Sequence, residues 1–271
     1  MKKILIINHN AGFFSNCSVK LVRIINYFNE YKKLPENVDS SVQYNFYKHK
    51  AGDITYNFFK HPTEIDLDIK YLLKIKTGDY QFLAFKKYID FPNINPFIKK
   101  YFTVSEDINN IKEKLIEKYC INLNKTIAIL YRTGDKKKEM EIISNLDMIK
   151  KIKDLKGKFP DHRILVQSDD INFFNIVKSL WKDSIEINEI KKPPASYVGN
   201  PWSYIPILER ENQAQIFLAI MQIIAKSDKI ILNSGNVGIW AAYFRGNTEG
   251  IYQYVTKSIN NIKTNSKKGW L

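Results

Sequence analysis

The sequence predicts an α/β protein in which parallel strands are covered by helices. Short apolar runs alternate with longer segments whose apolar residues recur at helical spacing, most regularly after residue 122. Apolar residues make up 44% of the chain and charged residues 26%, as is usual for a globular protein. At about 100–200 residues per domain, the length of 271 residues indicates one large domain or two small ones.

The N-terminal part opens like a βαβ unit. Residues 3–8 are predicted to form a buried parallel strand, followed by a turn at 10–12 and a helix over about 15–30. The turn is not a G-x-G-x-x-G fingerprint, which argues against a dinucleotide cofactor. Residues 34–104 are rich in Tyr, Phe and Asn, and we expect two or three short strands and helices there.

The alternation becomes regular after a predicted amphipathic helix over 105–119, which Ser105 is expected to cap. We place the domain boundary near this helix, so that residues 1–115 form an N-terminal domain and residues 116–271 a C-terminal domain with a short basic tail. The C-terminal domain is expected to contain strands at 126–131, 163–167, 185–189 and 229–233, and helices at about 139–156, 172–181, 213–226 and 237–245.

Charge and cysteine content limit the partners and the compartment. The net charge of +14 fits either an anionic partner or a compositional bias toward lysine, isoleucine and asparagine. The basic residues are scattered, which argues against nucleic acid as the partner. Cys17 and Cys120 have no near partner, so a reducing cytoplasm is expected. The longest apolar run, 216–225, is too short to span a membrane, so a membrane would be met only from its surface.

Three predicted strands end in polar strings, at 131–136 (Tyr-Arg-Thr-Gly-Asp-Lys), 167–170 (Gln-Ser-Asp-Asp) and 233–236 (Asn-Ser-Gly-Asn). The carboxyl ends of parallel strands face the ligand in sheets of this kind, so the three strings are expected to face one crevice. The histidines show no metal-ligand spacing with another His or Cys, and no metal is expected.

Arg132 is the strongest candidate in these strings. Its planar guanidinium can bind two oxygens of a diphosphate and keeps its charge. Asp135 is expected to orient Arg132 or Lys136. The alternative is a surface turn that contains a salt bridge.

The other two strings have a functional and a structural interpretation. Asp169 and Asp170 can accept hydrogen bonds from a base or a ribose, or they can cap the following helix. The string Ser234, Gly235 and Asn236 opens a helix whose backbone N–H groups attract anions, or it serves as a plain helix cap. Trp240, in the helix that follows, is expected to be a core residue.

In order and spacing, these strings resemble the fucosyltransferase superfamily, which includes α1,2- and α1,6-fucosyltransferases and protein O-fucosyltransferases. The family pattern is roughly H-x-R-R-x-D-(K/Y), then (T/S)-D-D after a strand, then a serine-rich strand–helix turn often followed by W-A-A. The similar segment is about 124–247. The leading His is replaced by Leu130 or Tyr131, and the second Arg by Thr133.

The resemblance implies a GT-B-like fold of two facing Rossmann-like domains with parallel sheets, the N-terminal one on the acceptor side. It also implies inverting, metal-independent transfer from a GDP-sugar, most often GDP-fucose, to a glycan or glycolipid. By motif, Arg132 would hold the β-phosphate, and Asp169 or Asp170 the guanine or ribose. Ser234 and its neighbours would contact the phosphates or the base.

Three further residues complete the predicted site. Gly12, in the first strand–helix turn, is counted among the nucleotide-sugar contacts. Glu139 and Glu141 follow the Asp-Lys pair, where some relatives carry an acid, and are the candidate general bases. Their alternative is a surface charge in the first turn of a helix.

Two other functions fit the sequence. One is a GT-B glycosyltransferase that uses a UDP- or dTDP-linked sugar, such as rhamnose. The other is a basic α/β protein that binds RNA or another anion without catalysis.

Overall fold

The computed structural model describes residues 4–62, 80–133, 141–191, 201–256 and 268–271. Its largest element is a six-stranded sheet in the C-terminal half, with the order β5-β4-β3-β6-β7-β8. All neighbouring pairs are parallel except β7 and β8. The strands are β3 (Thr126–Tyr131), β4 (Arg163–Ser168), β5 (Ile185–Glu186), β6 (Lys229–Asn233), β7 (Ile251–Val255) and β8 (Gly269–Trp270).

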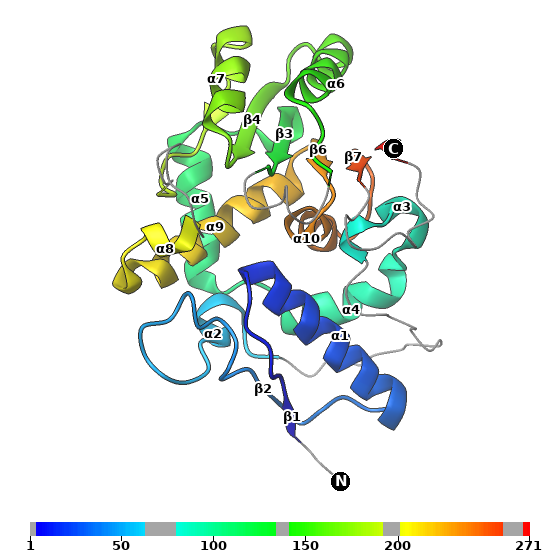
Figure 1. The fold of residues 1–271 in the computed structure, drawn as a ribbon, viewed down its shortest axis with the longest axis vertical. Coiled ribbons are helices and arrows are strands. Elements are labelled where there is room, and N and C mark those ends of the chain that lie inside the picture. The colour runs from blue at the N-terminus through cyan, green and yellow to red at the C-terminus, as the bar shows by residue number, and fades with distance from the viewer. Residues whose placement is uncertain (1–3, 63–79, 134–140, 192–200, 257–267) are drawn as a thin grey trace.

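Helices cover both faces of this sheet (Figure 1). The helices from residue 106 onward are α5 (Glu106–Lys118), α6 (Asn145–Lys158), α7 (Ile171–Leu180), α8 (Pro201–Tyr204), α9 (Ile207–Lys226) and α10 (Asn236–Arg245). Ile127 and Ile129 of β3 pack with residues of α6 and α7, whereas Ala128 and Leu130 join the core formed with α9 and α10. Successive side chains on a strand point to opposite faces, so a strand that is apolar throughout is buried on both.

The N-terminal half contains a smaller parallel sheet of β1 (Ile4–Ile6) and β2 (Asn37–Asp39). Its helices are α1 (Phe13–Tyr31), α2 (Thr55–Phe58), α3 (Phe85–Tyr88) and α4 (Phe91–Tyr101), with short 3₁₀ turns at Tyr80–Phe82 and Leu123–Lys125. The predicted first strand is therefore present, but its burial was wrong: Ile4 is 50% and Ile6 60% exposed. Two strands bury less surface than a wide sheet whose faces are both covered by helices.

The two halves share one hydrophobic core. Phe14 of α1 stacks on Trp240 of α10 with ring centroids 5.7 Å apart, and the Trp240 indole Nε1–H donates to Ser18 Oγ at 2.9 Å. Trp240 is fully buried, as predicted. The predicted boundary between residues 115 and 116 lies inside α5, which packs against α9. The division into two domains stays a prediction.

Most predicted elements of the C-terminal half are confirmed, and the differences have local causes. Helix α6 begins at Asn145 because Ser144 caps it, accepting a hydrogen bond from the Asp147 N–H at 3.1 Å. Helix α9 begins at Ile207, directly after Pro206, which is earlier than predicted. Ser105 precedes α5 but makes no side-chain cap. Strand β7 lies in a segment for which no strand was predicted.

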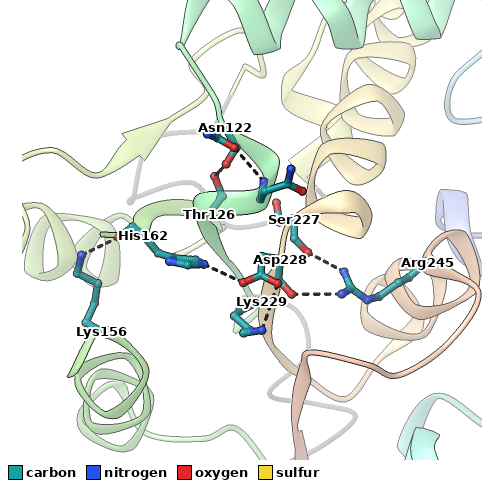
Figure 2. Close-up of polar contacts among 9 residues, drawn as sticks. Asn122, Thr126, Lys156, His162, Ser227, Asp228, Lys229 and Arg245 are labelled. Atoms are coloured by element: carbon teal, nitrogen blue, oxygen red, sulfur yellow. Dashed lines mark hydrogen bonds and ion pairs between the residues drawn. The ribbon is translucent and has the colours of Figure 1, made fainter. Parts of the chain in front are cut away.

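A polar network ties the loops at the amino edge of the sheet (Figure 2). The Asp228 carboxylate contacts His162 Nε2 at 2.8 Å and accepts a hydrogen bond from Lys229 Nζ at 3.1 Å. Burial alone would raise the pKa of Asp228, but these hydrogen bonds outweigh it and lower the pKa. The Arg245 guanidinium donates to the carbonyl oxygens of Ser227 at 2.6 Å and Asp228 at 3.2 Å. The network fixes the α9–β6 turn at the edge opposite the polar strand ends.

Candidate functional site

Arg132 directly follows β3 at the carboxyl edge of the six-stranded sheet. Its backbone is held by the side-chain amide of Asn233, the last residue of β6. The Arg132 N–H donates to Asn233 Oδ1 at 3.2 Å, and Asn233 Nδ2 donates to the Arg132 carbonyl oxygen at 2.9 Å. Asn233 is only 3% exposed. Asn233 belongs to one of the three strand-end strings, but no role was predicted for it.

Asp169, from the neighbouring strand end, contacts the Arg132 side chain. The Arg132 Nε–H donates to Asp169 Oδ2 at 3.2 Å, while Asp169 Oδ1 accepts the Thr133 N–H at 2.8 Å. The pair is partly shielded, with side-chain exposures of 29% for Arg132 and 22% for Asp169. Parallel pairing of β3 and β4 places Tyr131 opposite Ser168, which brings the next residues within reach. Strand ends far apart in sequence are therefore joined, as predicted.

Asp170 caps α7. Its Oδ1 accepts hydrogen bonds from the backbone N–H groups of Asn172 at 2.9 Å and Phe173 at 3.1 Å. The capping interpretation of the acidic pair is thus confirmed for Asp170, and Asp169 instead orients an arginine. Contact of either carboxylate with a nucleotide stays a prediction.

The groups at the start of α10 make contacts within the protein. Ser234 is 2% exposed, and its hydroxyl donates to the Tyr254 carbonyl oxygen at 3.3 Å. The Gly235 N–H donates to the Gln81 carbonyl oxygen at 2.8 Å. Asn236 Oδ1 accepts a hydrogen bond from Ser18 Oγ at 3.0 Å. The predicted roles of these residues toward a nucleotide stay predictions, and Gly235, at φ 134°, takes a conformation that favours glycine.

The start of α1 belongs to the same region. Gly12 precedes α1, and no heavy atom lies within 4 Å of the position that a Cβ would take there. The next N–H, of Phe13, donates to the Tyr47 hydroxyl at 2.7 Å. Burial raises the pKa of Tyr47, whereas this hydrogen bond and the nearby positive charge of Arg132 act against the rise. The hydrogen bond from Phe13 thus ties the start of α1 to Tyr47.

Tyr47 and Ser18, which contact the starts of α1 and α10, were not predicted as site residues. Tyr47 lies in a segment rich in tyrosine, so no local signal distinguishes it. His9, at the end of the first predicted strand, contacts Ser15 Oγ through Nε2 at 3.3 Å, and burial lowers its pKa.

The predicted acids and the basic residue after Arg132 are only partly described. Asp135, Lys136 and Glu139 lie outside the described residues. Glu141 is exposed, and its carboxylate pairs with the ammonium group of Lys268 near the C-terminus. One of the two candidate bases is therefore engaged in an ion pair within the protein.

Within the described ranges, no group of three His, Cys, Asp or Glu side chains is placed to hold a metal ion. No helix in these ranges combines the length and apolar character needed to cross a membrane.

Solved fucosyltransferase structures resemble this chain over nearly its whole length. NodZ α-1,6-fucosyltransferase soaked with GDP-fucose matches with a TM-score of 0.57 and 11% identity, over 96% of this chain and 100% of that one. The chain shares the fold of a fucosyltransferase. NodZ co-crystallised with GDP gives 0.55 at 12% identity, and NodZ from Bradyrhizobium gives 0.54 at 12%, each over 96% of this chain and 99% of the other.

The similarity confirms the predicted GT-B-like α/β class. At 11–12% identity, this structural similarity establishes the fold alone. Comparisons of the sequence with models of protein families and with curated proteins find no match.

Proposed function

We propose that the protein is a cytoplasmic glycosyltransferase that moves a sugar from a nucleotide diphosphate donor to a hydroxyl of a glycan or glycolipid. The donor proposed is GDP-fucose, and the reaction is inverting and metal-independent. The observation that carries the proposal is Arg132, held at the end of β3 by Asn233 through its backbone and by Asp169 through its Nε. The shared fold with NodZ structures that contain GDP or GDP-fucose supports a nucleotide-sugar donor.

In this proposal Arg132 stabilises the leaving group. The acceptor oxygen attacks the anomeric carbon of the sugar as the bond from that carbon to the diphosphate oxygen breaks. Negative charge then accumulates on the diphosphate, and a guanidinium that is already oriented stabilises that charge without reorganisation. The acceptor hydroxyl transfers its proton to a carboxylate. Attack on the face opposite the leaving group inverts the anomeric centre.

Glu139 and Glu141 are the proposed general bases. Glu141 is paired with Lys268, so its use as a base requires that this exposed ion pair open. Exposed ion pairs contribute about 0–1 kcal/mol, so opening it is energetically cheap.

The donor is tested by thermal shift with GDP, UDP and dTDP. A ligand at 100 times its Kd stabilises the protein by about 2.7 kcal/mol, which is readily measured. The proposal expects stabilisation by GDP alone, and GDP release from GDP-fucose that continues in EDTA. Stabilisation by UDP or dTDP would point instead to another nucleotide sugar. Polyanion binding with a steep salt dependence and no nucleotide effect would indicate a non-enzymatic anion-binding protein.

A further inference from the structure

The side chain of Asn233 extends the hydrogen-bonding pattern of the sheet beyond the end of β3. Backbone pairing between β3 and β6 runs as far as Leu130 and Leu232. One position later, the backbone of Asn233 pairs with Tyr254 of β7. Its side-chain amide turns to the other neighbour and engages both the N–H and the carbonyl of Arg132, at 3.2 and 2.9 Å. The amide thus replaces the backbone partner that β6 no longer supplies to Arg132.

Few side chains can make this contact. To hydrogen-bond both the N–H and the C=O of one residue, a side chain needs an acceptor and a donor side by side. A primary amide has both, whereas a carboxylate has no donor and an aliphatic group has neither. The amide is 3% exposed, so its bonds are shielded from water and removing one partner leaves buried backbone groups unpaired.

Arg132 is therefore held at both ends. Asn233, from one neighbouring strand, fixes the peptide groups on either side of its Cα. Asp169, beyond the other neighbouring strand, contacts its Nε at 3.2 Å. A guanidinium at the end of a flexible side chain is directed only when both its backbone and its head group are restrained.

We infer that Asn233 is a positioning residue that holds Arg132 in the geometry for binding the donor diphosphate. This inference rests on the proposed function, in which Arg132 contacts the β-phosphate. Asn233 itself acts through Arg132 and needs no contact with the ligand.

The test compares GDP with GMP, which lacks the β-phosphate. We expect Asn233→Ala to weaken GDP binding about tenfold, as fits the loss of one or two buried hydrogen bonds, and to leave GMP binding unchanged. A loss confined to GDP is not explained by general destabilisation, which weakens binding of both nucleotides. Asn233→Leu, which keeps the branching at Cγ but has no polar side-chain atoms, leaves no cavity and should weaken GDP binding in the same way.

A matched control is available in α9. Gln213 also carries a buried side-chain amide and is 5% exposed. Like that of Asn233, this amide both accepts and donates a backbone hydrogen bond: it accepts from the Lys191 N–H at 2.7 Å and donates to the Glu189 carbonyl oxygen at 3.1 Å. Gln213→Ala should lower the melting temperature about as much as Asn233→Ala does. It should not change the ratio of GDP affinity to GMP affinity.

A double-mutant cycle with Arg132→Ala separates the outcomes. If Asn233 acts only through Arg132, Asn233→Ala will have no further effect on GDP affinity in the Arg132→Ala background. Additive losses, or equal losses for GDP and GMP, would overturn the inference. If the wild type prefers GDP and Asn233→Ala retains that preference, the inference alone fails. If the wild type binds GDP no better than GMP, the proposed function fails and the inference with it.

Discussion

At the scale of single residues, the site depends on one arginine whose surroundings come from three strand ends. Arg132 was selected from the sequence because a planar cation at a strand end suits a diphosphate. The structure adds the contacts that orient it, with Asp169 at 3.2 Å from Nε. The acid expected in that role from the sequence, Asp135, lies outside the described residues.

Replacing Arg132 tests the site most directly. Arg132→Lys keeps the positive charge but loses the planar fork, and charge-assisted hydrogen bonds contribute about 1.5–3 kcal/mol, so we expect kcat/KM to fall about tenfold to a hundredfold. Arg132→Ala should lower it further, because the leaving-group charge is then unstabilised in the transition state. The melting temperature should change little in either variant. Steady-state kinetics with GDP-fucose check this, and an Arg132→Ala enzyme with wild-type kinetics would refute it.

A second residue-scale prediction concerns the buried amine of Lys20. Lys20 is 2% exposed, and its Nζ donates to Thr55 Oγ1 at 3.3 Å. Burial lowers its pKa to about 8, and attraction to Asp53 only partly opposes this. Below pH 8 the Lys20 amine is charged in both the folded and the unfolded protein. Because that charge is buried in the folded state, it lowers the free energy of unfolding.

Between pH 8 and the unfolded pKa near 10.5, the unfolded state binds more protons, so stability should rise with pH, by about 3 kcal/mol in all. Lys20→Met removes this contribution. Lys20→Met should therefore be more stable than the wild type at pH 7, and this difference should shrink as the pH approaches 10. Urea unfolding of both proteins at each pH measures it. The exposed Lys33, changed to Met, serves as the control. A difference between Lys20→Met and wild type that is the same at pH 7 and pH 10 would contradict the assignment.

At the scale of elements, the contact between β6 and α10 controls the position of the site. Helix α10 crosses the end of β6 so closely that a Cβ on Gly238 would lie 2.7 Å from the Asn233 carbonyl oxygen and 3.4 Å from Leu232 Cδ1. The obstacle is backbone, so the helix as a whole must shift to admit a side chain. The same residue, Asn233, holds Arg132, so helix packing and the arginine are mechanically linked.

Gly238→Ala should therefore destabilise the protein, although alanine is the better helix former. We expect overpacking to cost about 1–3 kcal/mol, against a helix-propensity gain of about 1 kcal/mol. Gly157→Ala in α6 is the control: no heavy atom lies within 4 Å of its added Cβ, so only the gain applies and the variant should be more stable. Chemical denaturation of both variants measures the difference. If Gly238→Ala and Gly157→Ala were stabilised equally, the contact between α10 and β6 would have space for a Cβ at residue 238.

At the scale of the whole molecule, the two halves are joined by aromatic packing. Phe14 of α1 and Phe102, which follows α4, have ring centroids 5.7 and 4.8 Å from that of Trp240 in α10. Figure 1 shows α10 lying between the six-stranded sheet and α1. A core shared in this way couples the stability of one half to that of the other.

We therefore expect the protein to unfold in one calorimetric transition. Trp240→Ala should destabilise it by about 3–5 kcal/mol, because it opens a cavity between the halves. Trp270, at the sheet edge and only partly buried, provides the control, and Trp270→Ala should cost clearly less. Scanning calorimetry measures the number of unfolding transitions. Two separate transitions in the wild type would mean that the halves fold independently.

Local pattern was enough to predict the strands β3, β4, β5 and β6 of the C-terminal sheet. Strands β3 and β6 have the predicted bounds, because unbroken apolar runs flanked by turns have few alternatives. Strand ends are also local features, so the positions of Arg132, Asp169 and Asp170 just after strands were predicted without a structure. Strand β7 was missed because its five residues, with Gln253 at the centre, give only a weak signal for a strand.

What the sequence by itself determined was the α/β class, the strand ends and the arginine placed at one of them. Only the tertiary structure decided which groups surround that arginine. Asn233 is 101 residues and Asp169 37 residues away in sequence from Arg132. The physical reason is that periodicity and turn signals act between near neighbours, whereas these contacts depend on strand order and helix packing. Those follow from how the whole chain buries its apolar surface.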